Sequence, residues 1–317
     1  MSTALVPITA APLTAVAQAA DTAAARSVFA DYRRRRAAHT LRRQDADLDL
    51  FARFLWSAGV AVEQLASNPA AWCGVSWGLV AGFVQWQLQQ GYAIGSVNVR
   101  LATVKSYAKL AMQAGAITPA EYALIKTVGG YRQREARNVD AERVQTRVGA
   151  KKAAAVSISL AQAMLLKSQD DPADALLMCL LLDHGLRCGE VAALTVEGFD
   201  IQRGTFTFYR QKVDKTQTHT MTVDTLRAAL RYLPGLEAGR LFSMSERTIN
   251  RRVGALGAAV GIARLSPHDL RHYWATAAVR GGTDIKSLQD AGGWSSPAMP
   301  LRYAESTVIA NTGVKLG

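Results

Sequence analysis

Residues 185–190 read Gly-Leu-Arg-Cys-Gly-Glu and place an arginine between two strongly apolar segments. These segments are residues 176–182 before it and 191–194 after it, so the Arg187 guanidinium is expected to be half-buried. A buried guanidinium needs a partner, and Glu190, one helical turn further on, can orient it. The pattern predicts either a structural ion pair, which is the commoner case, or an arginine positioned to bind an anion.

A second stretch, residues 266–272, reads Ser-Pro-His-Asp-Leu-Arg-His and has the pattern of a helix start. Serine is a common helix cap, and proline is a common first helical residue. His268 and Arg271 are three residues apart, so they share one face of the predicted helix. An imidazole and a guanidinium at a helix start suit an oxyanion or a phosphate, although most such pairs are ordinary surface residues.

The composition favours a globular protein with a polyanionic partner. The chain has 317 residues, of which 49% are hydrophobic, and this length suggests about two domains with cores of their own. The formal net charge is +12, and both halves share the basic excess, so nucleic acid is the favoured partner. The three cysteines form no paired motif, which argues against a disulfide framework or a zinc site and favours a reducing cytosol. With nucleic acid as the favoured partner, the expected location is the cytoplasm, in association with the nucleoid. No apolar run approaches ~18 residues, so no transmembrane helix is expected.

Periodicity divides the chain into four segments. Residues 1–20 are Ala-rich and interrupted by prolines, which predicts a mobile tail. Residues 21–130 show helical periodicity and predict a helical domain. In residues 131–155 the periodicity fails and arginines accumulate, which indicates a basic linker. Residues 156–317 predict a second domain, in which helices flank a β-hairpin at residues 205–223.

Basic side chains gather in the helical segment of residues 21–130. A solvated surface and a phosphate-contacting surface both remain open, because a run of charge alone is a weak signal. The candidate DNA-contacting residues are Arg33, Arg34, Arg35, Arg36, Arg42, Arg43, Arg100, Lys105 and Lys109.

Taken together with a third motif, these stretches resemble the tyrosine recombinase (phage integrase) family. The family's first arginine lies in a Gly-Leu-Arg-x-x-Glu box, which residues 185–190 match, and its second lies in a His-x-Leu-Arg-His box, which residues 268–272 match. Downstream, the family has Gly-His or Gly-Trp followed nine residues later by a tyrosine. Gly293, Trp294 and Tyr303 stand at that spacing.

The resemblance covers about residues 155–310, and residues 289–294 are particularly similar to Cre-type phage recombinases. It implies a mainly α fold with a small β-hairpin or sheet in the C-terminal catalytic domain. It also implies that the helical N-terminal domain is a core-binding domain, and that the two domains clamp DNA. Towards the N-terminus the likeness rests only on size, helicity and charge. A simple Cre-like or Xer-like recombinase is the expected type.

The resemblance implies a catalytic role for each motif residue. Arg187 and Arg271 clamp the non-bridging oxygens of the scissile phosphate and stabilise the charge that develops there. Tyr303 attacks the phosphorus, and His268 binds the phosphate or helps to take the phenol proton. Lys212, in the loop of the predicted hairpin, gives a proton to the departing 5′ oxygen.

Three further residues complete the expected site. Trp294 packs against it and can donate its indole N–H to a phosphate oxygen. Glu190 supports Arg187. Lys215 lies in the same predicted loop as Lys212 and stays an open alternative for the catalytic lysine.

The function that follows is site-specific cleavage and rejoining of DNA through a covalent 3′-phosphotyrosine, for integration, excision or resolution. No metal, nucleotide or other cofactor is expected, because the intermediate conserves the energy of the broken bond. The expected partners are a double-stranded DNA target and further copies of the chain in a homo-tetramer. One alternative is a type IB topoisomerase, which relaxes DNA without exchanging strands. Another is an inactive architectural DNA-binding protein.

Overall fold

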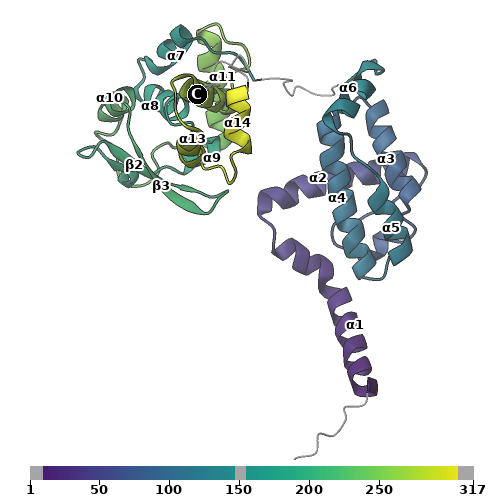
Figure 1. The fold of residues 1–317 in the computed structure, drawn as a ribbon. Helices are drawn as coiled ribbons and strands as arrows, with labels where there is room; N and C mark the ends of the chain where they lie inside the picture. The colour runs from purple at the N-terminus through teal and green to yellow at the C-terminus, as the bar shows by residue number, and fades with distance from the viewer. Residues whose placement is uncertain (1–9, 147–154, 306–317) are drawn as a thin grey trace, which may run out of the picture. The chain divides into compact units, whose positions relative to one another are not determined.

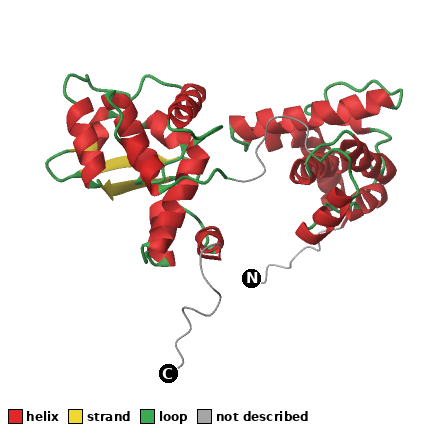
Figure 2. Ribbon diagram, turned by 90° about the horizontal axis from the view of Figure 1, so that it is seen from above, coloured by secondary structure: helices red, strands yellow, loops and turns green. Residues whose placement is uncertain are grey.

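The computed structural model describes residues 10–146 and 155–305, and the chain divides into two compact units, Met1–Lys151 and Lys152–Gly317 (Figure 1). Each unit has a hydrophobic core of its own. Both are mainly helical, and the second contains a three-stranded sheet (Figure 2). The predicted mainly α fold with a small sheet is confirmed.

The N-terminal unit is built around a cluster of buried aromatic rings. Phe51 lies between Trp72, at 5.9 Å between ring centroids, and Phe83, at 5.1 Å. Tyr107 stacks on Trp72 at 6.4 Å between ring centroids. These large apolar rings supply much of the area that the unit removes from water. The helices are α1 (Ala10–Arg34), α2 (Ala38–Ser57), α3 (Trp77–Gln89), α4 (Ile94–Gln113), α5 (Pro119–Thr127) and α6 (Gln133–Ala141).

Two elements of this unit extend beyond the expected segments. Helix α1 begins at Ala10, so the latter part of the predicted tail of residues 1–20 is helical, while residues 1–9 lie outside the described part. Helix α6 lies inside the predicted linker. It starts there because the Glu135 carboxylate accepts a hydrogen bond from the Arg132 main-chain N–H at 2.8 Å. Residues 147–154 of the linker are not described.

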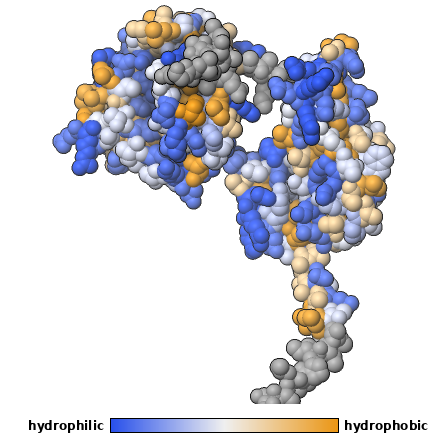
Figure 3. Space-filling view, in the orientation of Figure 1, coloured by the Kyte–Doolittle hydropathy of each residue, from blue (hydrophilic) through white to orange (hydrophobic). Residues whose placement is uncertain are grey.

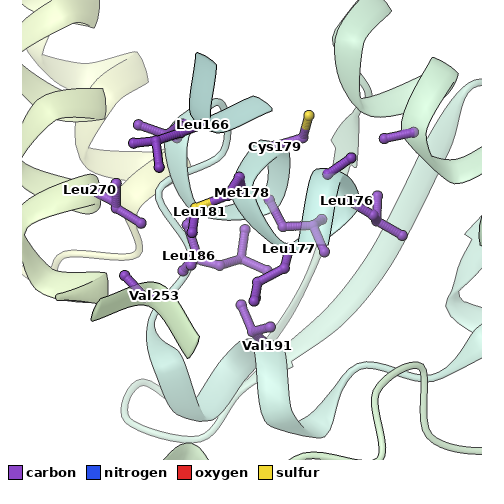
Figure 4. Packing of buried hydrophobic residues seen from close by; sticks show 14 of the residues in the cluster. Leu166, Leu176, Leu177, Met178, Cys179, Leu181, Leu186, Val191, Val253 and Leu270 are labelled. Atoms are coloured by element: carbon purple, nitrogen blue, oxygen red, sulfur yellow. The ribbon is translucent and has the colours of Figure 1, made fainter. Parts of the chain in front are cut away.

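The core of the C-terminal unit surrounds α8 (Pro172–Leu182), which is buried on all sides from Asp174 onwards. A helix that is apolar all round belongs in the middle of a domain. Side chains of α9, α11 and α12 meet it there (Figure 4). The other helices are α7 (Leu160–Lys167), α9 (Cys188–Ala193), α10 (Val223–Tyr232), α11 (Glu246–Ala259), α12 (Pro267–Arg280), α13 (Ile285–Gly292) and α14 (Ala298–Glu305).

The sheet is antiparallel, with β2 (Thr205–Arg210) between β1 (Phe199–Asp200) and β3 (Lys215–Thr220). Strands β2 and β3 form the predicted hairpin. Strand β1 was not predicted, because two residues are too few to show a period. Side chains of β2 alternate in burial, and its inward positions are Phe206, Phe208 and Arg210.

Hydrophilic residues cover most of the face shown in Figure 3, and hydrophobic residues occur there in small groups. None of the described helices is both long and apolar enough to cross a bilayer. Within residues 10–146 and 155–305, no three His, Cys, Asp or Glu side chains are grouped so that they could hold a metal ion.

Two histidines lie on the inward side of the sheet: His219 belongs to β3, and His184 packs against Phe206 of β2. The His184 Nε2 lies 3.0 Å from the Thr225 Oγ1, and the His184 ring centroid lies 4.8 Å from that of Phe206 and 5.7 Å from that of His219. Burial lowers the pKa of His184 to about 4 and that of His219 to about 3. Both imidazoles are therefore neutral in the folded protein at neutral pH.

We predict that the C-terminal unit loses stability as the pH falls below ~6.5, the ordinary pKa of histidine in an unfolded chain. Between ~6.5 and the lowered values, the unfolded chain binds protons that the folded chain does not. The stabilisation is thus complete above ~6.5, and about 2 kcal/mol is lost for either histidine by pH ~5. Thermal unfolding followed across this range measures the loss. A His184→Asn/His219→Gln variant should show a shallower pH dependence, whereas His39→Gln, which changes an exposed side chain, should not.

Candidate active site

A cavity of about 180 Å³ lies where the starts of α9 and α12 meet α11. Arg187, His268 and Arg271 line it together with Asn250 and other residues. Two stretches that are more than seventy residues apart in sequence thus contribute their basic side chains to one small space. Such a space, lined by two guanidiniums and an imidazole, is suited to a tetrahedral oxyanion.

Arg187 occupies the cap position of α9, and Glu190 holds it there. The Arg187 main-chain N–H donates to the Glu190 Oε2 at 2.8 Å, and the Arg187 Nη1 donates to the Oε1 at 2.7 Å. Glu190 is buried, while Arg187 keeps part of its surface open. The carboxylate therefore fixes both the start of the helix and the direction of the guanidinium.

Arg271 is almost completely buried in the first turns of α12. Its Nη2 donates to the Gly292 carbonyl at 2.6 Å, and its Nη1 donates to the Gly185 carbonyl. The guanidinium carbon lies 4.5 Å from the centroid of the Trp294 ring, a cation–π distance. Burial lowers the pKa of Arg271 to about 9, and the nearby charges of Arg187 and Arg210 add to this effect.

Tyr303, on α14, lies against the same group of side chains. Its ring centroid is 5.9 Å from that of Trp294 and 4.7 Å from that of His272. The tyrosine is only 3% exposed, and burial raises its pKa, while Arg271 and other arginines act in the opposite direction. Trp294 thus links Arg271 to Tyr303. Its predicted hydrogen bond to a phosphate stays a prediction.

The remaining predicted site residues lie at the surface. His268 is exposed, and its ring centroid is 5.3 Å from that of His272. Lys212 is exposed in the turn between β2 and β3, and the exposed Lys215 stands opposite Arg210 in the strand ladder. Neither lysine lines the cavity of Arg187 and Arg271. The choice between the two lysines therefore remains a prediction.

Six of the nine candidate DNA-contacting residues have partners inside the N-terminal unit. Arg34 binds Asp31 at 2.9 Å, and Arg36 packs on the Tyr32 ring at 4.6 Å. Arg33 binds Asp45 at 2.6 Å, Arg43 binds Asp47 at 2.5 Å, Arg100 packs on Tyr92 at 4.3 Å, and Lys105 donates to the Lys126 carbonyl at 2.9 Å. These contacts occupy at least part of each cation. The other three side chains are exposed: Arg35, Arg42 and Lys109. Contact of any of the nine with DNA stays a prediction.

The sequence analysis missed Arg210, which is fully buried at the end of β2. Its Nη1 donates to the Glu190 Oε2 at 2.7 Å, so Glu190 joins two arginines. The alternation of apolar residues in this strand could have identified Arg210 from the sequence. The alternation of the strand places Arg210 on the same inward face as Phe206 and Phe208, where an arginine needs a partner.

Comparison with known proteins agrees with this geometry. Residues 159–308 match the model of the phage integrase family. The C-terminal unit belongs to the phage integrase family. The matched segment includes each of the motifs that carry the resemblance, from the box of Arg187 to Tyr303.

Two curated relatives are tyrosine recombinases. XerA of Saccharolobus solfataricus is 32% identical over 117 residues, which cover 37% of this chain and 40% of the relative. XerD of Neisseria meningitidis serogroup B is 31% identical over 131 residues, which cover 37% of this chain and 45% of the relative. The chain thus spans about half the length, or less, of the curated relatives that it matches.

A solved structure extends the likeness of fold to both units. The lambda integrase dimer bound to a COC′ core site matches with a TM-score of 0.60 at 15% identity. The match covers 90% of this chain and 93% of that one. It shows that this chain shares the fold of that integrase.

Gly185 offers a test of how tightly the site is packed. We predict that Gly185→Ala strongly destabilises the C-terminal unit, because its φ is +58° and a Cβ would overlap the Trp274 ring. The left-handed backbone costs about 1–2 kcal/mol for a residue with a Cβ, and overpacking adds roughly 1–3 kcal/mol. Gly204→Ala is the matched control, since its φ is +63° but no atom lies within 4 Å of the added carbon. Thermal unfolding should show the larger loss for Gly185→Ala, and equal losses would contradict the predicted overlap.

Proposed function

We propose that the chain is a site-specific DNA recombinase that cuts and rejoins strands through a covalent bond between Tyr303 and a 3′ phosphate. The observation that carries this proposal is the joint arrangement of the site. Arg187, His268 and Arg271 line one small cavity, and Trp294 connects Arg271 to Tyr303. Membership of the phage integrase family supports the same activity.

In the proposed reaction, the scissile phosphate enters the cavity between the two arginines. Their guanidiniums bind its non-bridging oxygens and stabilise the negative charge that grows on them as the Tyr303 oxygen attacks the phosphorus. The bond from phosphorus to the 5′ oxygen breaks, and that oxygen takes a proton from Lys212. His268 binds the phosphate or accepts the phenol proton. A 5′ hydroxyl then attacks the phosphotyrosine and releases Tyr303.

The burial of Tyr303 supports the proposal that this conformation precedes DNA binding. The phenol is nearly inaccessible, and burial raises its pKa, which opposes formation of the phenolate. A phosphate in a DNA duplex can reach this oxygen only if α14 shifts or the duplex inserts beside it. Exposure of the phenol next to Arg271 would remove the effect of burial and leave the favourable effect of the guanidinium.

The proposed partners are a double-stranded DNA target and further copies of the chain, as a tetramer on two target sites. The basic excess of both halves supports contact with DNA by both units. A type IB topoisomerase with the same chemistry would relax supercoiled DNA without joining strands from different duplexes. A strand-exchange assay separates these two activities.

We predict that the wild-type chain forms a covalent adduct with DNA that contains its target and that Tyr303→Phe forms none, since phenylalanine has no nucleophilic oxygen. Fragments that flank the gene of this chain are the first substrates. The adduct is measured as protease-sensitive, slowly migrating DNA after denaturation in SDS. Arg271→Ala should reduce the rate by about 10²- to 10³-fold, the usual effect of losing one donor to a developing oxyanion.

Tyr232→Phe is the matched control for the nucleophile. Tyr232 is also partly buried in the C-terminal unit, and its hydroxyl only donates to the Leu241 carbonyl at 3.0 Å. The control should form the adduct at the wild-type rate. An adduct with Tyr303→Phe would assign the attack to another residue. Tight, salt-sensitive binding of the target without any adduct would instead favour an architectural protein.

A further inference from the structure

Arg210 is a cation buried without access to solvent, and each of its three nitrogens has a protein acceptor. The Nη1 donates to the Glu190 Oε2 at 2.7 Å, the Nη2 to the Ala291 carbonyl at 2.5 Å, and the Nε to the Gln217 Oε1. These acceptors belong to α9, α13 and β3. The Arg210 side chain therefore connects the hairpin to α9, which carries Glu190, and to α13, which ends just before Trp294.

Hydrogen bonds to α13 and β3 hold one side of the Arg210 guanidinium. Gln217, which accepts from the Arg210 Nε, also donates its amide to the Asp290 carbonyl at 2.6 Å. The last carbonyls of a helix have no partner within the helix and carry partial negative charge, so they favour a cation. A Cβ at Gly293 would overlap the Arg210 side chain, which shows how closely the backbone approaches it.

The other end of Arg210 acts on Glu190. The Glu190 Oε2 accepts from both the Arg210 Nη1 and the Arg187 main-chain N–H, and the Oε1 accepts from the Arg187 Nη1. If Arg210 were absent, the carboxylate would lose its contact on one side and could turn about its side-chain bonds. The hydrogen bond that aims the Arg187 guanidinium would then have no fixed acceptor.

Arg210 does not itself line the cavity of Arg187, His268 and Arg271. We infer that Arg210 is a positioning residue: through Glu190 it holds Arg187 in the direction in which Arg187 binds a phosphate. The inference rests on the proposed function, because it takes the cavity to be the phosphate site. It adds to that function a residue two positions before Lys212 that contacts neither the phosphate nor the nucleophile.

The experiment measures the affinity of the full-length chain for inorganic phosphate by isothermal titration, so it does not require a target DNA. Arg210→Met should weaken binding about tenfold, since coupling between groups of one network is commonly of this size. Glu190→Gln should weaken binding similarly. If both residues act on Arg187 by one route, the double variant should also bind about tenfold more weakly, rather than about a hundredfold.

Arg252→Met is the matched control, because Arg252 also holds a buried carboxylate: its Nε donates to the Asp174 Oδ1 at 2.7 Å. This variant should lower the unfolding temperature and leave phosphate binding unchanged. If Arg210→Met does not fold, Arg210→Lys replaces it in the cycle. Lysine keeps the positive charge, but its single ammonium group cannot reach all three acceptors of the planar guanidinium. Weaker phosphate binding is therefore expected for this variant too.

Unchanged affinity in folded Arg210 variants would overturn the inference, and so would multiplied losses in the double variant or an absence of phosphate binding in the wild type. Failure of the proposed function looks different. A wild-type chain that binds phosphate, responds to Arg210 and forms no Tyr303 adduct would contradict the recombinase proposal alone. An adduct whose rate is the same in wild type and Arg210→Lys would contradict the positioning role alone.

Discussion

The Glu190 carboxylate, buried between Arg187 and Arg210, is the interaction on which the arrangement of the site depends. Its two oxygens accept from both guanidiniums and from the main-chain N–H of Arg187, the residue that caps α9. Removing the carboxylate would leave the buried Arg210 guanidinium without its counter-charge, and such a loss commonly costs about 3–5 kcal/mol. The start of α9, the turn end of the β2–β3 hairpin and the direction of Arg187 are therefore fixed together.

The apolar core holds in place the two helices whose first turns carry Arg187 and Arg271. Helix α8 is buried all round, and α9 and α12 pack on it through Val191 and Leu270 (Figure 4). Because close-packed interiors tolerate little displacement, the first turns of the two helices are held near each other. Arg187 and Arg271 stand at these first turns. Each is then adjusted by hydrogen bonds, to Glu190 for Arg187 and to two main-chain carbonyls for Arg271.

The sequence predicted the parts of the site that motifs and helical spacing encode. The placing of Arg187, His268 and Arg271 around one cavity follows from their boxes, and the helix start at Pro267 follows from its cap pattern. Arg210 was missed because its partners are distant in sequence: Glu190 precedes it by twenty residues, and Ala291 follows it by eighty-one. Local periodicity could show only that its side chain points inward.

The same limit applies to the basic residues of the N-terminal unit. A run of arginines is visible in the sequence, but the carboxylates that bind some of them are not. Arg33 pairs with Asp45 on the next helix and also donates to the Tyr107 hydroxyl, so it helps to hold three helices together. Net charge predicts the class of partner and cannot identify which cations are free to meet it.

The site holds more positive than negative charge, which affects both the stability of the fold and the proposed binding of phosphate. Besides burial, the positive charges of Arg187 and Arg210 lower the pKa of Arg271, whereas the negative charge of Glu190 raises it. Carbonyls of Gly185, Ala291 and Gly292 accept from two of these cations, but they are dipoles and do not cancel a full charge. The folded chain thus keeps an excess of positive charge in a poorly hydrated place, at a cost in stability. In the proposed reaction, a phosphate in the cavity would relieve this repulsion, and more so as negative charge grows on its oxygens during attack, so the same repulsion would favour the transition state over the bound ground state.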